Sequence, residues 1–474
     1  MSLLPLLVPS NRGRGLLAAG AELTHAELAA ASGRVAAALA GVERVAVPAT
    51  PEPETCVAIL GALRAGVTAV PVNPGAGEGE LGHLVRDSDP DAVLCAPGAE
   101  LPAPLAGRRR IAVALGGEGG AGPGPIAAAG PAFILYTSGT TGPPKGVIVS
   151  RRAILADIEG LAAAWQWTAA DVVAHSLPLF HAHGLILGLL GPLHLGGTAM
   201  LLGRFSPAAV AAALRGPATM FFGVPTMYRR LRLAAEADPE LAAALAGARL
   251  LVSGSAALPA AEHRAVERLT GQRIVERYGM TETMITIAAR GDGPRRAGSV
   301  GVPVPGVDVR LVDDRGAALA AGAVGEIEVR GPTLFDGYLG LPEESRASLR
   351  EGWFRTGDLA IRDRDGSFRL VGRRDTDLIK TGGYRVGAGE VEAALLEHPG
   401  VAEAAVTGVP DPDLGERIVA WVVAADAAAP PAAEELTEHV AATLSPHKRP
   451  REIRFRDSLP RGSMGKVQKS RLAA

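Results

Sequence analysis

Residues 133–146 of the 474-residue chain read Phe-Ile-Leu-Tyr-Thr-Ser-Gly-Thr-Thr-Gly-Pro-Pro-Lys-Gly, and this stretch decides the fold. A short apolar run, typical of a buried strand, leads into a loop of glycines and hydroxyl side chains that ends at Lys145. Backbone N–H groups, hydroxyls and a lysine crowded into one loop bind phosphate oxygens, so we predict a phosphate-binding loop. It is not a Walker A loop, because the spacing G-x-x-x-x-G-K-[ST] is absent. A surface turn rich in glycine and threonine is the alternative interpretation.

On both sides of this loop, short apolar runs alternate with helical stretches, which predicts an α/β fold with mainly parallel strands. We expect strands over residues 44–48, 133–136, 218–223, 249–253 and 273–276. From residue 306 to 330 the apolar positions alternate with period two, which indicates a small antiparallel sheet or barrel-like part.

The C-terminal region reads as a separate, smaller α+β unit. Helices are expected over residues 389–397 and 433–444, and strands over 401–408 and 417–424. We place the boundary between Arg374 and Asp375, which gives a large body over residues 1–374 and a lid over residues 375–474.

Composition and charge exclude several classes of function. A net charge of -2 argues against a nucleic-acid binder or a protein of anionic membranes. Cys56 and Cys95 lack metal-ligand spacing, so neither a zinc site nor a disulfide framework is expected. Residues 172–203 carry no Asp, Glu, Lys or Arg, but their prolines and histidines indicate a buried helix followed by a strand at 198–202 rather than a membrane span. With no targeting segment evident, we expect a cytoplasmic protein.

Lysine is rare in this chain, although 48 residues are basic. Arginine fills almost every basic position, so the few lysines mark places where a compact ammonium is needed. The lysines are Lys145, Lys380, Lys448, Lys466 and Lys469.

Several further motifs follow the loop in order, and together they resemble the adenylate-forming superfamily. That superfamily includes acyl-CoA synthetases, adenylation domains of peptide synthetases and beetle luciferases. The resemblance spans roughly residues 20–470. The motifs are Ser253-Gly-Ser255, Arg277-Tyr-Gly-Met-Thr281-Glu282, Gly-Glu-Ile-Glu-Val-Arg-Gly at 325–331, Trp-Phe-Arg-Thr-Gly-Asp at 353–358, Gly-Arg-Arg-Asp at 372–375, Lys-Thr-Gly-Gly-Tyr at 380–384 and Pro-Arg-Gly-Ser-Met-Gly-Lys at 460–466.

The resemblance implies an ATP site with Mg²⁺, in which Tyr278 stacks on adenine, Asp358 binds the ribose near Arg373, and Glu282 holds the metal ion. From the residues alone, Tyr278 also fits a core position, Thr281-Glu282 a helix cap and Asp358 a turn. Lys466, Thr281 and Glu282 are the implied catalytic residues. The implied ATP-binding residues are Thr137, Ser138, Gly139, Thr140, Thr141, Gly142, Lys145, Ser255, Tyr278, Thr281, Asp358, Arg373 and Lys466.

A mobile lid follows from the same resemblance. Asp375 matches the hinge about which the lid turns between two poses. One pose presents Lys466 to the α-phosphate and carboxylate during adenylation, where it neutralises developing charge. The other opens a thiol channel past Gly382 and Gly383, whose missing side chains leave room for the pantetheine arm of CoA. The alternative for Lys466 is a solvated lysine near the end of the chain.

The acid substrate is indicated by two features. No acidic residue lies between Asp171 and Arg204, where amino-acid-activating relatives hold an aspartate, and no carrier domain follows Lys466, so a freestanding CoA ligase is favoured. Position 277, often glycine in relatives, is an arginine. A guanidinium in an apolar pocket requires an anion, which a second carboxylate on the substrate provides. A structural salt bridge between Arg277 and Glu276 or another acid is the alternative.

Three strings resemble malonyl-CoA synthetases in particular: Glu-Arg-Tyr-Gly-Met-Thr-Glu at 276–282, Phe-His-Ala-His-Gly-Leu at 180–185 and Val-Pro-Thr-Met-Tyr at 224–228. This resemblance implies malonate or methylmalonate as substrate, with coenzyme A as co-substrate. His183 and Ser253 are further polar contacts, although His183 equally fits a core position. Ala182 and Ile285 fall where relatives line the acyl pocket, and the small Ala182 leaves space for a methyl branch. A ligase for an aryl or medium-chain monocarboxylic acid is the main alternative function, and a non-catalytic nucleotide-binding module or a luciferase-like oxygenase are others.

Overall fold

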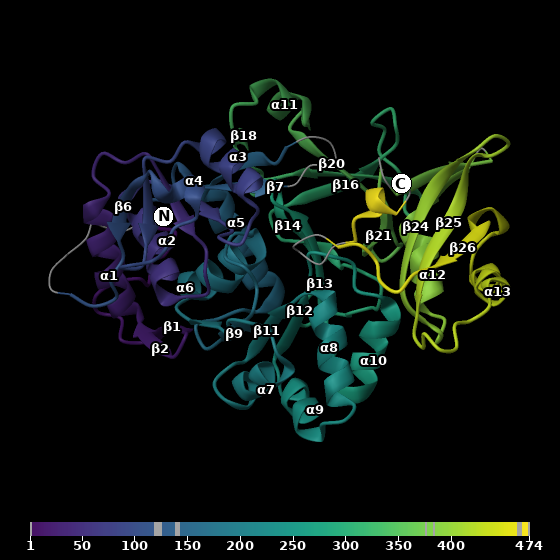
Figure 1. Ribbon diagram of the computed structural model, residues 1–474, viewed down its shortest axis with the longest axis horizontal. Helices are drawn as coiled ribbons and strands as arrows, with labels where there is room; N and C mark the ends of the chain where they lie inside the picture. The colour runs from purple at the N-terminus through teal and green to yellow at the C-terminus, as the bar shows by residue number, and fades with distance from the viewer. Residues whose placement is uncertain are drawn as a thin grey trace.

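A computed structural model describes residues 2–117, 126–137, 143–374, 377–382, 384–461 and 467–472. Within these residues the strands form four sheets, three in the body and one in the C-terminal part (Figure 1). In Figure 1 the purple-to-green body fills the left and centre, and β24, β25 and β26 of the C-terminal part stand at the right. The expected α/β fold is confirmed.

Two large sheets of mixed direction build the body. Their inner strands are parallel, and antiparallel strands lie at both edges of the nine-stranded sheet and at one edge of the seven-stranded sheet, whose other edge strand is parallel. The nine-stranded sheet has the order β15 (Val302–Pro303), β14 (Met284–Ala288), β13 (Val275–Met280), β12 (Leu250–Ser253), β11 (Met220–Gly223), β9 (Val172–His175), β10 (Thr198–Leu201), β1 (Arg14–Ala18) and β2 (Ala21–Thr24). The seven-stranded sheet has the order β18 (Gly337–Tyr338), β8 (Lys145–Ser150), β7 (Pro131–Thr137), β4 (Thr68–Val72), β3 (Arg44–Pro48), β5 (Ala92–Cys95) and β6 (Arg109–Ala112).

Helices cover both faces of these sheets because successive strand residues point to opposite sides. Phe221 packs with α7, α8, α9 and α10, whereas Phe222 packs into the main core. The helices of the body are α1 (His25–Ala38), α2 (Pro53–Ala65), α3 (Glu78–Ser88), α4 (Ala103–Ala106), α5 (Arg151–Trp165), α6 (Gly191–Leu195), α7 (Pro207–Arg215), α8 (Pro225–Ala235), α9 (Pro239–Ala246), α10 (Ala260–Thr270) and α11 (Pro342–Ala347).

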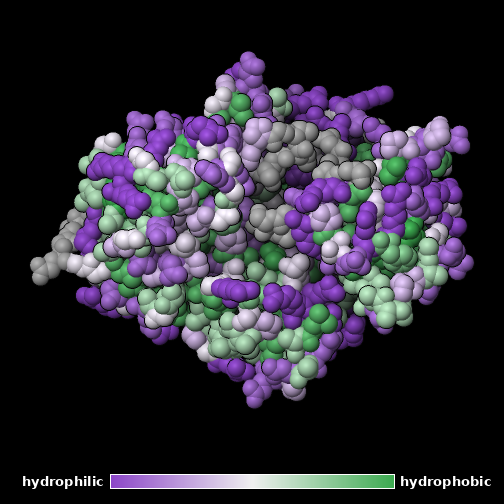
Figure 2. Space-filling view, in the orientation of Figure 1, coloured by the Kyte–Doolittle hydropathy of each residue, from purple (hydrophilic) through white to green (hydrophobic). Residues whose placement is uncertain are grey.

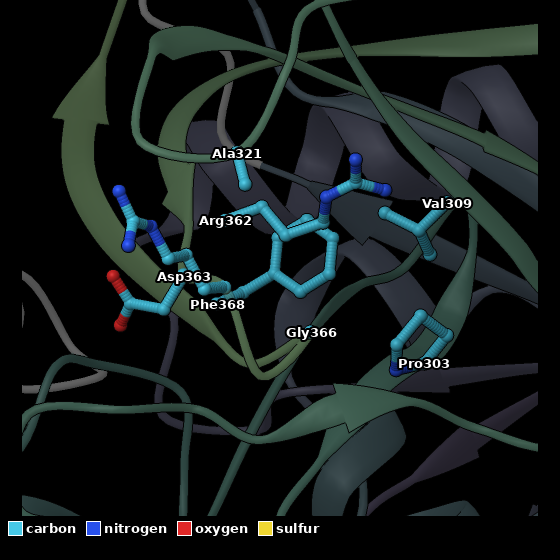
Figure 3. Close-up of a pocket in the computed structure, with 8 residues that line it drawn as sticks. Pro303, Val309, Ala321, Arg362, Asp363, Gly366 and Phe368 are labelled. Carbon is cyan, nitrogen blue, oxygen red and sulfur yellow. The ribbon is translucent and has the colours of Figure 1, made fainter.

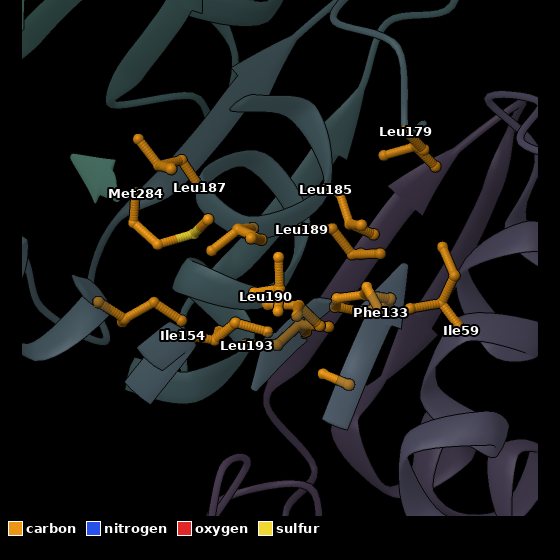
Figure 4. Packing of buried hydrophobic residues seen from close by; sticks show 14 of the residues in the cluster. Ile59, Phe133, Ile154, Leu179, Leu185, Leu187, Leu189, Leu190, Leu193 and Met284 are labelled. Carbon is orange, nitrogen blue, oxygen red and sulfur yellow. The ribbon is translucent and has the colours of Figure 1, made fainter. Parts of the chain in front are cut away.

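The apolar segment after residue 172 is buried inside the body, as expected. It forms a π-helix (His183–Leu190), then α6 and then β10. Its leucines pack against Phe133, Ile154 and Met284 (Figure 4). Gly188 allows this helix to approach β9, because a Cβ at that position would lie 2.6 Å from the His175 ring. No helix among the described residues is long and apolar enough to cross a membrane.

The third sheet is antiparallel, as the period-two pattern predicts. Its strands are β16 (Asp308–Val312), β17 (Val324–Arg330), β20 (Trp353–Arg362), β19 (Leu349–Arg350) and β21 (Phe368–Arg373), which pairs with β20. The register places Asp358 opposite Arg373.

The C-terminal part has its own sheet and core. The sheet contains β23 (Tyr384–Gly387), β22 (Leu378–Thr381), β25 (Gly415–Ala424), β24 (Val401–Asp411) and β26 (Glu452–Phe455), and the helices are α12 (Ala388–Leu396) and α13 (Ala433–Thr443) with two 3-10 turns (Pro446–Lys448 and Lys469–Arg471). These elements agree with those expected from the sequence. The division into 1–374 and 375–474 stays a prediction, and Asp375 lies outside the described residues.

Hydrophilic side chains are spread over the face of the molecule in Figure 2, with smaller hydrophobic areas between them.

Candidate functional site

The candidate site lies where β12 and β13 of the nine-stranded sheet meet the antiparallel sheet. Ser253 ends β12, and Arg277 and Tyr278 lie on β13. In α/β sheets ligands bind beyond the carboxyl ends of the parallel strands, and this is where the sequence motifs converge. The described site residues fall into two groups, an arginine cluster and an aspartate cluster.

The arginine cluster consists of Asp157, His183, Ser253, Ser255 and Arg277, and Ser255 links His183 to Arg277. The Ser255 hydroxyl lies 3.2 Å from His183 Nδ1 and accepts a long hydrogen bond of 3.5 Å from Arg277 Nη2. Ser255 has a φ of 68°, a left-handed conformation that costs energy for a residue with a side chain. The fold therefore holds this serine in a strained backbone position between the histidine and the arginine.

Arg277 is buried, with 7% of its surface exposed, and its guanidinium lies on the backbone of Gly254. A Cβ at position 254 would come within 2.2 Å of the guanidinium carbon, so any larger residue there would require the Arg277 side chain to move. Burial lowers the pKa of Arg277 to about 10, and the side chain is still charged at neutral pH. The site thus contains a buried positive charge.

No described carboxylate forms an ion pair with Arg277. Glu276, named as an alternative partner, instead lies 3.2 Å from His263 Nδ1. Asp157 is the acid that influences Arg277 electrostatically, but its Oδ1 accepts a hydrogen bond from Ile285 N over 2.9 Å. Burial raises the pKa of Asp157 to about 7, so this group is only partly ionised near neutral pH.

Several polar atoms of the arginine cluster are buried and have no hydrogen-bond partner among the described residues. Buried polar atoms in proteins are normally bonded, so these atoms have bonding capacity left for water or a ligand. Burial lowers the pKa of His183 well below its usual value, which keeps the ring neutral. The atoms are Arg277 Nε, His183 Nε2, Ser253 Oγ and Asp157 Oδ2.

Two residues expected to line the acyl pocket border this cluster. Ala182 directly precedes the π-helix that carries His183, and Ile285 is buried on β14. Asp157, on α5, was not anticipated from the sequence, because its link to the site depends on a contact with a residue 128 positions away.

The aspartate cluster consists of Tyr278, Glu282, Asp358 and Arg373. Asp358 accepts a hydrogen bond of 2.7 Å from the Tyr278 hydroxyl and pairs with Arg373 Nε over 2.9 Å. Burial and the nearby Asp358 charge raise the pKa of Tyr278 well above its usual value, so the hydroxyl donates. The expected proximity of Asp358 and Arg373 is confirmed.

Lys145 approaches this cluster through Tyr338. The Tyr338 hydroxyl donates to Glu282 over 3.0 Å, and Lys145 Nζ lies 5.4 Å from the centre of the Tyr338 ring. Lys145 also forms an ion pair with Glu344 on α11. Tyr338 and Glu344 were not found from the sequence. The only signal was the pair Gly337-Tyr338, which β18 places beside β8.

Glu282 is suited to Mg²⁺. Its carboxylate is buried, and burial raises its pKa. No group of three or more metal-ligating side chains occurs in the described ranges. Mg²⁺ is commonly bound by one or two carboxylates together with substrate phosphates.

Part of the predicted site lies outside the described residues. Thr137 ends β7 opposite Lys145, which begins β8, so the predicted phosphate loop joins two paired strands. Thr281 precedes Glu282 in the turn between β13 and β14, and Gly382 has a φ of 55° in the turn between β22 and β23. The residues not described are Ser138, Gly139, Thr140, Thr141, Gly142, Asp375, Gly383 and Lys466.

A separate pocket of about 330 Å³ opens beside the antiparallel sheet (Figure 3). It contains none of the residues of the two clusters. Its lining residues are Pro303, Val309, Ala321, Arg362, Asp363, Arg364, Gly366 and Phe368.

Comparison with known proteins agrees with this arrangement. Residues 11–339 match the AMP-binding enzyme family, and residues 390–466 match the AMP-binding enzyme C-terminal domain. A malonate–CoA ligase of Arabidopsis thaliana is 37% identical over 90% of this chain and 77% of its own length.

Two solved structures are similar over nearly the whole chain. A malonyl-CoA ligase ternary product complex with methylmalonyl-CoA and AMP bound is 55% identical, covers 97% of this chain and 99% of its own, and has a TM-score of 0.74. ATP-bound MatB from Rhodopseudomonas palustris is 35% identical, covers 100% of this chain and 98% of its own, and has a TM-score of 0.90. The less similar sequence therefore has the more similar overall shape.

Proposed function

The chain belongs to the AMP-binding enzyme family, and from this premise we propose that it is an AMP-forming ligase that joins malonate and methylmalonate to CoA. The observation that carries the choice of acid is the buried Arg277, whose Nε has no partner among the described residues. A second carboxylate on the substrate satisfies this guanidinium, and a monocarboxylate leaves it unpaired.

In the first step one carboxylate of malonate attacks the α-phosphorus of ATP. A bond forms between the carboxylate oxygen and phosphorus, and pyrophosphate leaves. Arg277 holds the distal carboxylate, and the neutral His183 and Ser253 donate hydrogen bonds to the same anion from buried positions. The substrate is thereby fixed with only one carboxylate free to react.

The nucleotide is held by the opposite side of the site. Asp358 accepts hydrogen bonds from the ribose hydroxyls, Tyr278 supplies the aromatic face for adenine, and the loop from Thr137 to Lys145 with Thr281 binds phosphates. Glu282 would hold Mg²⁺, which supplies charge neutralisation on the phosphate oxygens. Lys466 neutralises the charge that develops at the reacting oxygens.

In the second step the sulfur of CoA attacks the carbonyl carbon of the adenylate. The carbon–sulfur bond forms, the bond to the AMP oxygen breaks, and the thiol proton passes to solvent. We propose that the lid over residues 375–474 turns about Asp375 between the steps and opens a channel past Gly382 and Gly383. The lower TM-score with the product complex than with the ATP-bound relative supports a cycle with two poses.

We include methylmalonate among the proposed substrates because Ala182, the residue before the π-helix, is small. Ala182 has only a methyl side chain, which leaves space beside Ile285 for a branch on the substrate. Larger side chains at position 182 are expected to exclude methylmalonate before they exclude malonate.

A panel of acids tests the proposal. Pyrophosphate release is measured with ATP, CoA and each of malonate, methylmalonate, acetate, butyrate, benzoate and a coumarate, and the thioester products are identified by mass spectrometry. Malonate and methylmalonate should be the preferred substrates, with AMP as the second product. Preference for an aryl or medium-chain acid would support the alternative ligase, and absence of AMP with every acid would exclude ligase activity on this panel.

A further inference from the structure

In the lid, the residues that flank the segment carrying Lys466 are bonded to each other, and we call these residues, 460–461 and 467–468, the base of the segment. Arg461 and Val467 form an isolated antiparallel bridge, and Gln468 N donates to the carbonyl oxygen of Pro460 over 2.8 Å. Lys466 itself is not described, but both ends of its segment are joined by these contacts. The place of this base therefore limits where Lys466 can reach.

Lys469 fixes the base from one side through two short ion pairs. Its Nζ lies 2.6 Å from Asp377 Oδ1 and 2.6 Å from Glu392 Oε1. The lysine side chain is 18% exposed and the two carboxylates are 17% and 21% exposed, so water screens the pairs only in part. A largely buried lysine with two carboxylates is uncommon on a protein's surface and calls for a reason.

The two carboxylates come from different parts of the lid. Asp377 follows β21 closely and also accepts a hydrogen bond from Arg373 N over 2.9 Å. Glu392 lies on α12 and accepts one from Val406 N, on β24, over 2.8 Å. Lys469 thus connects the base of the Lys466 segment to the residues next to the proposed hinge and to the lid core.

The choice of lysine at this position is informative because the chain uses arginine almost everywhere. A compact ammonium can donate in three directions and fits between two carboxylates of separate segments. Lys448 also pairs with a carboxylate of α12, that of Glu390.

We propose that Lys469 is a positioning residue for adenylate formation, fixing the base of the Lys466 segment to α12 and to Asp377. Asp377, Glu392 and Lys469 all follow the proposed hinge, so the three move together when the lid turns. Because only the first step uses Lys466, loss of Lys469 affects adenylation and not thioester formation. This inference rests on the proposed function.

The test compares Lys469→Met with the matched variant Lys448→Met. Lys469→Met should lower kcat for pyrophosphate release from ATP and malonate by about 100-fold, the cost of misplacing a reacting group by about 1 Å. KM for both substrates and the rate of thioester formation from supplied malonyl-AMP should stay within about twofold, since the pocket itself is intact. Lys448→Met removes an ion pair of similar burial from the same helix and should leave adenylation unchanged.

Two results would overturn the positioning role: adenylation by Lys469→Met at the wild-type rate, or an equal loss in both half-reactions. Either leaves malonate activation by the wild type intact, whereas a wild type that releases no pyrophosphate with malonate refutes the proposed function instead. If Lys469→Met does not fold, the double variant Lys469→Met with Glu392→Gln carries the same test, because it removes one of the two carboxylates that lose their lysine partner and that burial penalises.

Discussion

The two clusters of the candidate site differ in whether their buried polar groups are already bonded to other side chains. In the aspartate cluster, Asp358 is already bonded to Tyr278 and Arg373. In the arginine cluster, Arg277 Nε and His183 Nε2 have no partner in the described part of the chain. The first cluster keeps its geometry before a nucleotide arrives, whereas the second has bonding capacity left for a ligand. We therefore expect substitutions in the aspartate cluster to alter affinity for ATP less than substitutions in the arginine cluster alter selectivity for the acid.

The largest effect should come from removing the Arg277 guanidinium, which forms no ion pair with a described carboxylate. Arg277→Gly is expected to lower kcat/KM for malonate by about 10⁴-fold, because the second carboxylate is then buried without a partner. Short monocarboxylates should be disfavoured less, or accepted. The acid panel measures this, with Arg273→Gly as the control, since Arg273 is 57% exposed and pairs with Glu267. Unchanged malonate kinetics in Arg277→Gly would show that the diacid assignment is wrong.

Lys466 belongs to neither cluster, and its removal separates the two steps. Lys466→Ala should slow adenylate formation by about 10³-fold through loss of transition-state charge stabilisation. Thioester formation from supplied malonyl-AMP should be spared. Single-turnover assays of each half-reaction measure the two rates, and an equal loss in both would contradict the two-pose cycle.

Asp157, in the arginine cluster, should also make the stability of the folded protein depend on pH. Burial raises the pKa of Asp157 to about 7, so the folded state keeps a proton that the unfolded state loses near the ordinary carboxyl value of 3.8. The wild type should lose stability as pH rises between these two values. Asp157→Asn keeps a side-chain oxygen for Ile285 N and lacks this titration.

Thermal unfolding of both proteins at pH 4, 5.5, 7 and 8 measures the effect. The Tm of Asp157→Asn relative to the wild type should rise with pH by a few degrees and level off above about pH 7, where the wild-type carboxyl is ionised in both states. A difference that is constant over this range would contradict the raised pKa of Asp157.

The smallest effect is expected from removing an ion pair on the nucleotide side of the site that ATP displaces when it binds. Glu344 pairs with Lys145 in this structure, and the phosphates of ATP must displace it. Glu344→Gln should lower KM for ATP by about twofold to fivefold at low salt and less at high salt, as for an exposed ion pair. Initial rates at varied ATP measure this, with the neighbouring Glu343→Gln as control. An increase in KM would mean that Glu344 assists binding.

Much of the fold follows from local sequence. The apolar runs predicted the strands around the phosphate loop, and the alternating pattern near residue 310 predicted the antiparallel sheet, because strand period and burial are local properties. The charge-free segment after residue 172 was correctly expected to be a buried helix and strand. Its π-helical form was not anticipated, because the apolar pattern of the segment does not distinguish helix types.

Each site residue that was predicted lies in a short sequence motif. One motif holds Arg277, Tyr278 and Glu282 within six residues, and other motifs hold Lys145, Asp358 and Arg373. Asp157 and Tyr338 reach the same site from α5 and β18, through strand order and tertiary packing that no local pattern records. The bonded state of Asp358 and the unbonded state of Arg277 are likewise properties of the assembled sheets.

The glycine beneath the Arg277 guanidinium has a consequence for how this enzyme can diverge. A single methyl group at position 254 would lie within 2.2 Å of the guanidinium carbon and would displace the Arg277 side chain from the backbone of residue 254. Conversely, an exchange of Arg277 for a small residue frees the space over Gly254 and removes the contact that disfavours a side chain at position 254. The two positions are therefore coupled in one direction: Arg277 can change while Gly254 stays, but a side chain at position 254 requires the guanidinium to move or to be replaced.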